Sequence, residues 1–95
     1  MFRISIVEAP DQRRLVLEGR LVQPWTAEVE AAWKTAGEQL QSRKLLVDLT
    51  NVTFISAEGE TTLIKLMREG AQFLCRDVLT KHVLRQLARR CRCAP

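Results

Sequence analysis

The chain has 95 residues, of which 46% are hydrophobic and 27% charged, so we expect one globular domain with a single modest core. No apolar run approaches the roughly 20 residues that a membrane-spanning helix needs. The N-terminus also lacks the long apolar stretch that is typical of a secretion signal. These features predict a cytoplasmic protein that does not insert directly into a membrane.

The net charge of +4 is concentrated near the C-terminus. Residues 76–95 contain six cations against a single acid, Asp77. Such a segment could attract nucleic acid, anionic lipid or an acidic protein. However, no aromatic residue stands among these cations to stack on bases. We therefore expect a solvated helix face and no nucleic-acid partner.

The first half of the chain predicts a β-hairpin followed by a helix. Apolar residues alternate with other residues over 2–7 and again over 15–21, which is typical of strands, and the stretch APDQR between them favours a turn. Thr26 is the expected N-cap of the helix, and Trp33 is the expected core anchor on its apolar face.

The centre of the chain predicts a strand and a second helix. Residues 44–49, KLLVDL, are almost continuously apolar, which favours a central strand covered on both faces. Ser56 is expected to cap the following helix, and Gly70 to end it. The apolar stripe of this helix contains Leu63, Ile64 and Met67.

The last part of the chain predicts a short strand over 71–76 and a final helix capped by Thr80. The order of elements is then β-β-α-β-α-β-α. Strands that alternate with helices after an opening hairpin indicate an α/β fold with a small mixed sheet and helices packed against it.

The residue types that usually perform catalysis do not come together in the sequence. His82 is the only histidine, and no carboxylate or nucleophile stands near it in sequence. Cys91 and Cys93 are separated by one residue, which is too few for the usual zinc knuckle, and Cys75 lies in an apolar run. No glycine-rich phosphate loop is present. We therefore expect a protein that is not an enzyme and has no catalytic, cofactor or metal site.

Three stretches, LEGRL, LLVDLTNVTFISAEG and TTLIKL, resemble the STAS domain of bacterial anti-sigma factor antagonists. The resemblance runs from about Phe2 to Cys91 and implies a single STAS-like domain over residues 1–95. In that family, a partner kinase that is also an anti-sigma factor phosphorylates a corner serine two residues before a glycine. The phosphate breaks the complex, because its charge adds repulsion and a desolvation cost at the interface. The resemblance implies an interaction module in bacterial signalling and regulation of transcription.

The sequence departs from the family at this corner. Ala57 stands two residues before Gly59, where the family has its phosphorylated serine, while Ser56 and Glu58 replace the flanking aspartate and hydroxyl residue. Ala57 could leave a permanent docking surface, Glu58 could supply a fixed negative charge, or Ser56 could be the new acceptor. Helix capping alone already explains the serine. We therefore expect partner binding without the usual serine switch.

The expected partner-binding surface is the corner and helix at 54–67. Its contact residues would be Ser56, Ala57, Glu58, Gly59, Glu60, Leu63, Leu66 and Met67. Leu66 lies at the edge of the apolar stripe, so it belongs either to the core or to the interface.

Two protein partners are consistent with the resemblance. One is a kinase-like anti-sigma factor, and the alternative is the ATPase of a phospholipid ABC transporter, with this chain as an accessory subunit. A nucleotide at the helix start is a third hypothesis, although Glu58 and Glu60 would repel its phosphates. Family members often add an element after the last helix, and its absence would leave an uncovered edge that favours a dimer.

Overall fold

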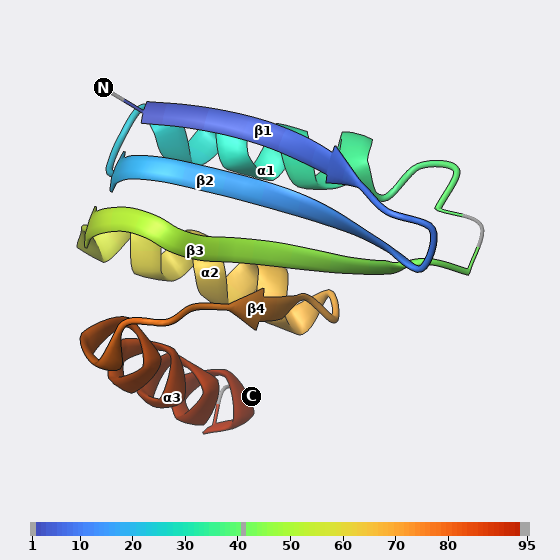
Figure 1. The fold of residues 1–95 in the computed structure, drawn as a ribbon. Helices are drawn as coiled ribbons and strands as arrows, with labels where there is room; N and C mark the ends of the chain where they lie inside the picture. The colour runs from blue at the N-terminus through green and yellow to red at the C-terminus, as the bar shows by residue number, and fades with distance from the viewer. Residues whose placement is uncertain (1, 41, 94–95) are drawn as a thin grey trace.

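The computed structural model describes residues 2–40 and 42–93, and it shows the predicted order of strands and helices (Figure 1). The side chains are described for residues 2–40 and 42–90. The elements are β1 (Phe2–Glu8), β2 (Gln12–Leu21), α1 (Trp25–Ala36), β3 (Lys44–Ile55), α2 (Ala57–Arg68), β4 (Gln72–Leu74) and α3 (Val78–Cys93).

The strands form one mixed sheet in the order β1-β2-β3-β4. β1 and β2 are antiparallel, whereas β2, β3 and β4 run parallel to one another. In Figure 1, α1 and α2 lie together behind the sheet, and α3 lies beyond β4. The predicted mixed sheet with packed helices is therefore confirmed.

β3 is buried on both faces over Val47, Asp48 and Leu49, as predicted for a central strand, although α1 and α2 cover only one of these faces. Leu15 pairs with Val47 on the face that carries α1 and α2, whereas Val16 pairs with Asp48 on the opposite face. Asp48 is nevertheless buried, because the Arg14 guanidinium lies 3.7 Å from its carboxylate and the Thr50 N–H donates to it at 2.9 Å. On the face opposite α1 and α2, polar contacts therefore accompany the predicted burial of β3.

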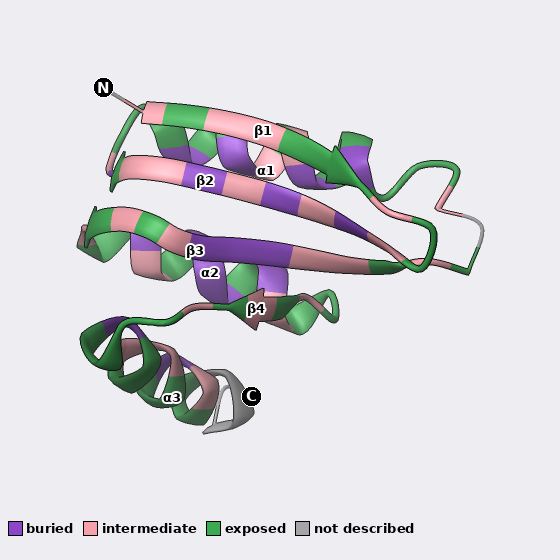
Figure 2. Cartoon of the chain, viewed as in Figure 1, coloured by how far each residue is buried: buried purple, intermediate pink, exposed green. Residues whose placement is uncertain are grey.

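The core lies between the sheet and the two helices behind it (Figure 2). Trp33 is only 9% exposed, which confirms its predicted role as the anchor of α1. Burying one large aliphatic side chain stabilises a fold by about 1.5–3 kcal/mol, so this cluster supplies the main driving force for folding. Its buried members are Leu15, Leu17, Leu21, Val29, Trp33, Val47, Leu49, Leu63, Ile64, Leu66 and Leu87.

Two of the predicted helix caps are wrong. α1 follows Pro24, so Thr26 is a buried residue inside its first turn rather than its cap. α3 begins at Val78, and the Asp77 carboxylate accepts from the backbone N–H of Thr80 at 2.9 Å. Aspartate is as good an N-cap as threonine, and the three-residue spacing places its oxygen over the free N–H.

β3 is longer and β4 shorter than the sequence predicted. β3 continues beyond 44–49 to Ile55, because β2 pairs with it as far as Leu21. β4 contains only Gln72–Leu74 and pairs with Leu46, Val47 and Asp48. The second half of β3 therefore extends past the end of β4.

Candidate functional site

The corner between β3 and α2 is held by Ser56. Its Oγ accepts from the Gly59 N–H at 3.1 Å and donates to the Leu21 carbonyl at 3.2 Å. Its backbone N–H donates to the same carbonyl at 3.0 Å. Ser56 therefore caps α2, as predicted, and also ties the end of β3 to the end of β2. At the other end of the helix, Gly70 follows with φ of 94°, which confirms the predicted stop.

Gly59 brings α2 close to the end of β2. A Cβ at this position would lie 2.6 Å from the Leu21 carbonyl oxygen and 3.1 Å from Cγ2 of Ile55. A backbone oxygen cannot move aside as a flexible side chain can. Gly59 is buried, and its lack of a side chain allows α2 to pack closely against the end of β2.

The predicted contact residues fall into separate environments. Ala57 and Glu58 are exposed, whereas Ser56, Glu60 and Met67 are half-buried. Leu63 and Leu66 are 0% and 1% exposed, so both pack in the core. α2 packs against α1 on one side and α3 on the other, which buries a wider arc than an isolated stripe would.

Three exposed apolar side chains lie near the corner, and only Phe54 falls within the predicted surface at 54–67. Phe54, Val78 and Leu79 are 48%, 77% and 74% exposed. Phe54 and Leu79 lie on opposite sides of a groove of about 310 Å³ between the end of β3 and the first turn of α3. Val78 and Leu79 come directly after Asp77, and this pair could have indicated an exposed apolar surface, because the first turn of a surface helix is usually polar. The groove is lined by Val52, Thr53, Phe54, Ile55, Glu60, Asp77, Leu79, Thr80 and Val83.

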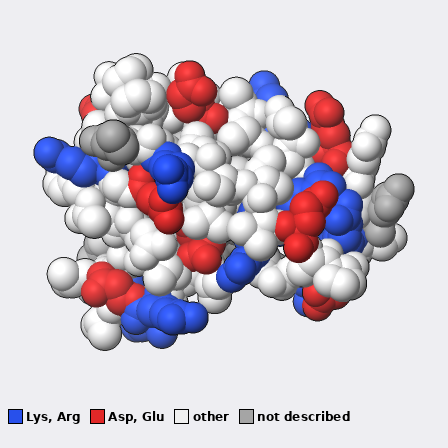
Figure 3. Space-filling view, turned by 45° about the horizontal axis from the view of Figure 1, so that its top comes forward, with Lys and Arg blue, Asp and Glu red and all other residues white. Residues whose placement is uncertain are grey.

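Charged groups lie at both sides of this groove. The Arg20 guanidinium lies 5.1 Å from the centroid of the Phe54 ring, which is a cation–π distance. Arg90 of α3 forms an ion pair with Glu60 at 3.3 Å, but both side chains are partly exposed, so the pair contributes little stability. On the face drawn in Figure 3, basic and acidic side chains are interspersed rather than gathered into one basic patch.

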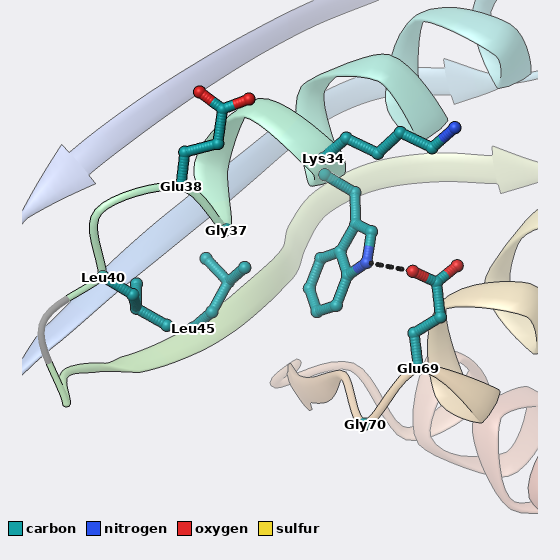
Figure 4. A pocket seen from close by; sticks show the side chains of 8 residues that line it. Lys34, Gly37, Glu38, Leu40, Leu45, Glu69 and Gly70 are labelled. Carbon is teal, nitrogen blue, oxygen red and sulfur yellow. Dashed lines mark hydrogen bonds between the residues drawn. The ribbon is translucent and has the colours of Figure 1, made fainter.

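A second pocket, of about 460 Å³, opens beside Trp33 at the C-terminal ends of α1 and α2 (Figure 4). The indole Nε1 of Trp33 donates to Oε1 of Glu69 at 3.1 Å. Lys34 and Glu38 bring opposite charges to the same rim. The hydrogen bond satisfies the polar edge of the indole, so Glu69 helps to anchor Trp33 in the core.

The remaining reactive side chains are dispersed. Cys75 is half-buried against the core, and burial raises the pKa of its thiol, which disfavours the nucleophilic thiolate. His82 is exposed and lies 3.1 Å from the Gln86 amide. Among the described residues, no group of three or more His, Cys, Asp or Glu side chains is placed to hold a metal ion. The side chains of Cys91 and Cys93 lie outside the described part.

No helix in the described part of the chain combines the length and the apolar composition required to cross a membrane. No protein-family model and no curated protein matches the sequence. Among solved structures, the chain is similar to an uncharacterized protein of the DUF3478 family from Shewanella loihica PV-4, which is described as having a SpoIIAA-like fold. The two structures superpose with a TM-score of 0.59 at 16% identity, over 88% of this chain and 75% of that chain. The similarity shows that this chain has a SpoIIAA-like, and hence STAS-like, fold.

Proposed function

We propose that this chain is a non-enzymatic interaction module that binds a regulatory protein at the corner between β3 and α2. Three exposed apolar side chains carry the proposal: Phe54 and Leu79 line the same groove beside the corner, and Val78 precedes Leu79 at the start of α3. Large exposed apolar side chains that lie together are unusual on a monomer and often mark a protein interface. The STAS-like fold supports the same reading.

The corner surface, defined as Phe54, Ala57, Glu58, Val78 and Leu79, has the composition of an interface. Its apolar members supply area that a partner can bury, and Glu58 supplies a charged rim. Glu60 lines the groove that joins the β3 and α3 parts of this surface. Leu63 and Leu66 are buried and hold α2 in the core, so the exposed residues would make the contact with the partner.

The module works by occupancy rather than by a serine switch. Ala57 is exposed where the related pattern has its phosphorylated serine, and a methyl group accepts no phosphate. The Ser56 hydroxyl already makes two hydrogen bonds inside the protein. Phosphate on Ser56 would remove the proton donated to Leu21 and would crowd the start of α2. Binding is therefore regulated by the amounts of the chain and its partner.

The proposal is tested by quantitative affinity capture from the organism that encodes the chain. Val78→Arg introduces a charge into the corner surface, and Val7→Arg makes the same change at a valine of β1 that is 39% exposed. We expect Val78→Arg to lose most of the specific partner and Val7→Arg to retain it, because central apolar contacts carry about 2 kcal/mol or more of binding energy. Equal capture by both variants would contradict the proposal.

The captured partner also identifies the regulatory class. A kinase-like anti-sigma factor is the proposed partner, and a transporter ATPase would instead assign the chain to the accessory subunits. Mass spectrometry of the same sample measures phosphate on Thr53, Ser56 and Thr61. We expect little phosphate there, and stoichiometric phosphate on Ser56 together with loss of the partner would overturn the occupancy mechanism.

A further inference from the structure

The second half of β3 has one unpaired edge. β2 pairs with β3 as far as Ile55, but β4 pairs only with Leu46, Val47 and Asp48 on the other side. No strand of the described residues lies beside positions 49–55 on that side. Beyond the Thr50 N–H, which already donates to the Asp48 carboxylate, this edge presents its backbone N–H and C=O groups over roughly 17 Å at the usual rise per residue.

The unpaired edge opens into the groove beside the corner. Val52 to Ile55 form one wall, and Leu79, Thr80 and Val83 of α3 form the opposite wall. After Leu74 the chain runs along the same side of β3 without pairing with it as a strand, and it enters α3 at Val78 (Figure 1). The groove therefore combines an open strand edge with exposed apolar side chains.

We infer that the groove binds an extended segment of another protein, which adds to β3 beside residues 50–55 as a further strand. The new strand would continue the row that β4 begins, and its side chains would cover Phe54 and Leu79. In this mode of recognition, backbone hydrogen bonds supply affinity and side-chain pockets supply specificity. The inference rests on the proposed function, because it states how the partner of the corner surface is held.

The groove also indicates the chemistry of the segment. Successive side chains of a strand point to opposite faces, so alternate residues of the segment should be apolar to fill the space between Ile55 and Val83. Glu60 and Asp77 line the same groove and favour a lysine or arginine beside the apolar residues. Because Arg90 already pairs with Glu60 and Asp77 Oδ2 caps Thr80, the added cation strengthens the fit rather than providing most of the affinity.

An extended segment fits the groove better than a second copy of this chain. One added strand needs only the spacing of about 4.8 Å between neighbouring strands. If two copies paired through their β3 edges, each would bring the first turn of its own α3 to the same junction. The wall formed by Leu79, Thr80 and Val83 therefore favours a single narrow occupant.

A random decapeptide display library, selected against the full chain, provides the probe. The strongest selected peptide is synthesised in three forms: unmodified, and N-methylated at either of its two alternate sets of residues. Alternate residues of a strand direct their N–H groups to opposite edges, so only one methylated set should obstruct pairing with β3. We expect that form to bind about tenfold or more weakly and the other to bind like the unmodified peptide.

Amide hydrogen exchange measured by NMR locates the bound peptide. We expect alternate amides within residues 50–55 to exchange more slowly in the complex. Leu79→Arg should weaken peptide binding, and Val7→Arg should not. Failure to select a binder, equal binding by both methylated forms, or protection elsewhere in the chain would overturn strand addition. If the amides of residues 50–55 are already protected from exchange without peptide, and this protection rises with protein concentration, the edge would instead pair with a second copy of the chain.

The two proposals fail in different ways. If Val78→Arg releases the native partner while peptide binding ignores N-methylation, the corner surface is an interface and strand addition is wrong. If the peptide pairs with β3 but neither Val78→Arg nor an excess of peptide affects partner capture, strand addition is real and the proposed function is wrong.

Discussion

The two ends of the sheet are closed in different ways. At the end that carries the β1–β2 turn, Arg13 is 9% exposed and donates to the carbonyls of Ala36 and Glu38 at 2.6 and 2.8 Å. It also pairs with Glu8, to which Arg43 donates at 3.0 Å. These bonds fasten the hairpin to the end of α1 and to the segment before β3.

The corner end instead leaves apolar surface uncovered. Phe54, Val78 and Leu79 are exposed there, and the ion pair between Arg90 and Glu60 joins α2 to α3 at the surface. A hydrogen-bonded network satisfies the polar groups of the first end, where Ile6 and Val7 are 45% and 39% exposed, whereas Val78 and Leu79 at the corner end are more exposed still. Under the proposed function, the corner end is therefore the recognition end of the sheet, and hydrogen bonds within the chain close the opposite end.

Replacing Arg13 should have the largest effect on stability. Arg13→Met keeps much of the side-chain volume but leaves the Ala36 and Glu38 carbonyls without their donor. We expect the free energy of unfolding to fall by about 2–3 kcal/mol in urea titrations, because hydrogen bonds from a charged group are strong when buried. Arg3→Met is the control on the same hairpin, since Arg3 is 74% exposed and its ion pair spans 3.9 Å. Equal losses in both variants would show that the closed end is not held by Arg13.

Gly59→Ala tests the close packing at the corner. The added methyl group would meet the Leu21 carbonyl, so we expect a loss of about 1–3 kcal/mol in unfolding free energy. Gly37→Ala is the matched control, because a Cβ there would lie 3.5 Å or more from its neighbours. This control should be neutral or slightly stabilising, since alanine restricts the unfolded chain. If Gly59→Ala is tolerated as well as Gly37→Ala, α2 can shift away from Leu21 without a loss of unfolding free energy.

Ser56→Ala should have a smaller effect. It removes the helix cap, which usually stabilises a protein by about 1 kcal/mol. Thr61→Ala provides the comparison, because Thr61 is exposed and its hydroxyl donates to a carbonyl of its own helix at 3.2 Å. Thermal unfolding should therefore separate the two variants. If Ser56→Ala is neutral while partner capture falls, Ser56 acts in recognition rather than in capping.

The sequence predicted the order of elements and the corner because both depend on nearby residues. Alternation of apolar residues identified β1 and β2, and helical spacing identified α1 and α2. Ser56 and Gly59 interact across three residues, so the cap at the corner was visible as a local pattern. Its place in the fold, against the Leu21 carbonyl, required the pairing of β2 with β3.

The errors arose where distant or competing residues decide the outcome. Asp77 and Thr80 are both good caps, and only the observed start of α3 separates them. The predicted strand ended at residue 49, but exposed residues such as Asn51 and Thr53 continue β3 because β2 still pairs beside them. Leu66, which the sequence left open between core and interface, is a core residue because α2 packs against both α1 and α3. The groove depends on α3 lying beside β3, some 25 residues away in sequence.

The smallest predicted effect concerns pH at the closed end. The hydrogen bond from Arg13, supported by the charges of Arg13 and Arg43, lowers the pKa of the Glu8 carboxyl below its ordinary value of 4.5. Because the folded state lowers this pKa, Glu8 contributes stability above pH 4.5, and the contribution is lost as the pH falls through the folded-state pKa. Glu8→Gln should therefore be less stable than the wild-type chain near pH 7, with the difference shrinking toward pH 3. Urea unfolding at a series of pH values measures this difference, and identical profiles would exclude a role for the charge. Glu8 is more than half exposed, so salt should also reduce the difference at neutral pH by screening both guanidinium groups.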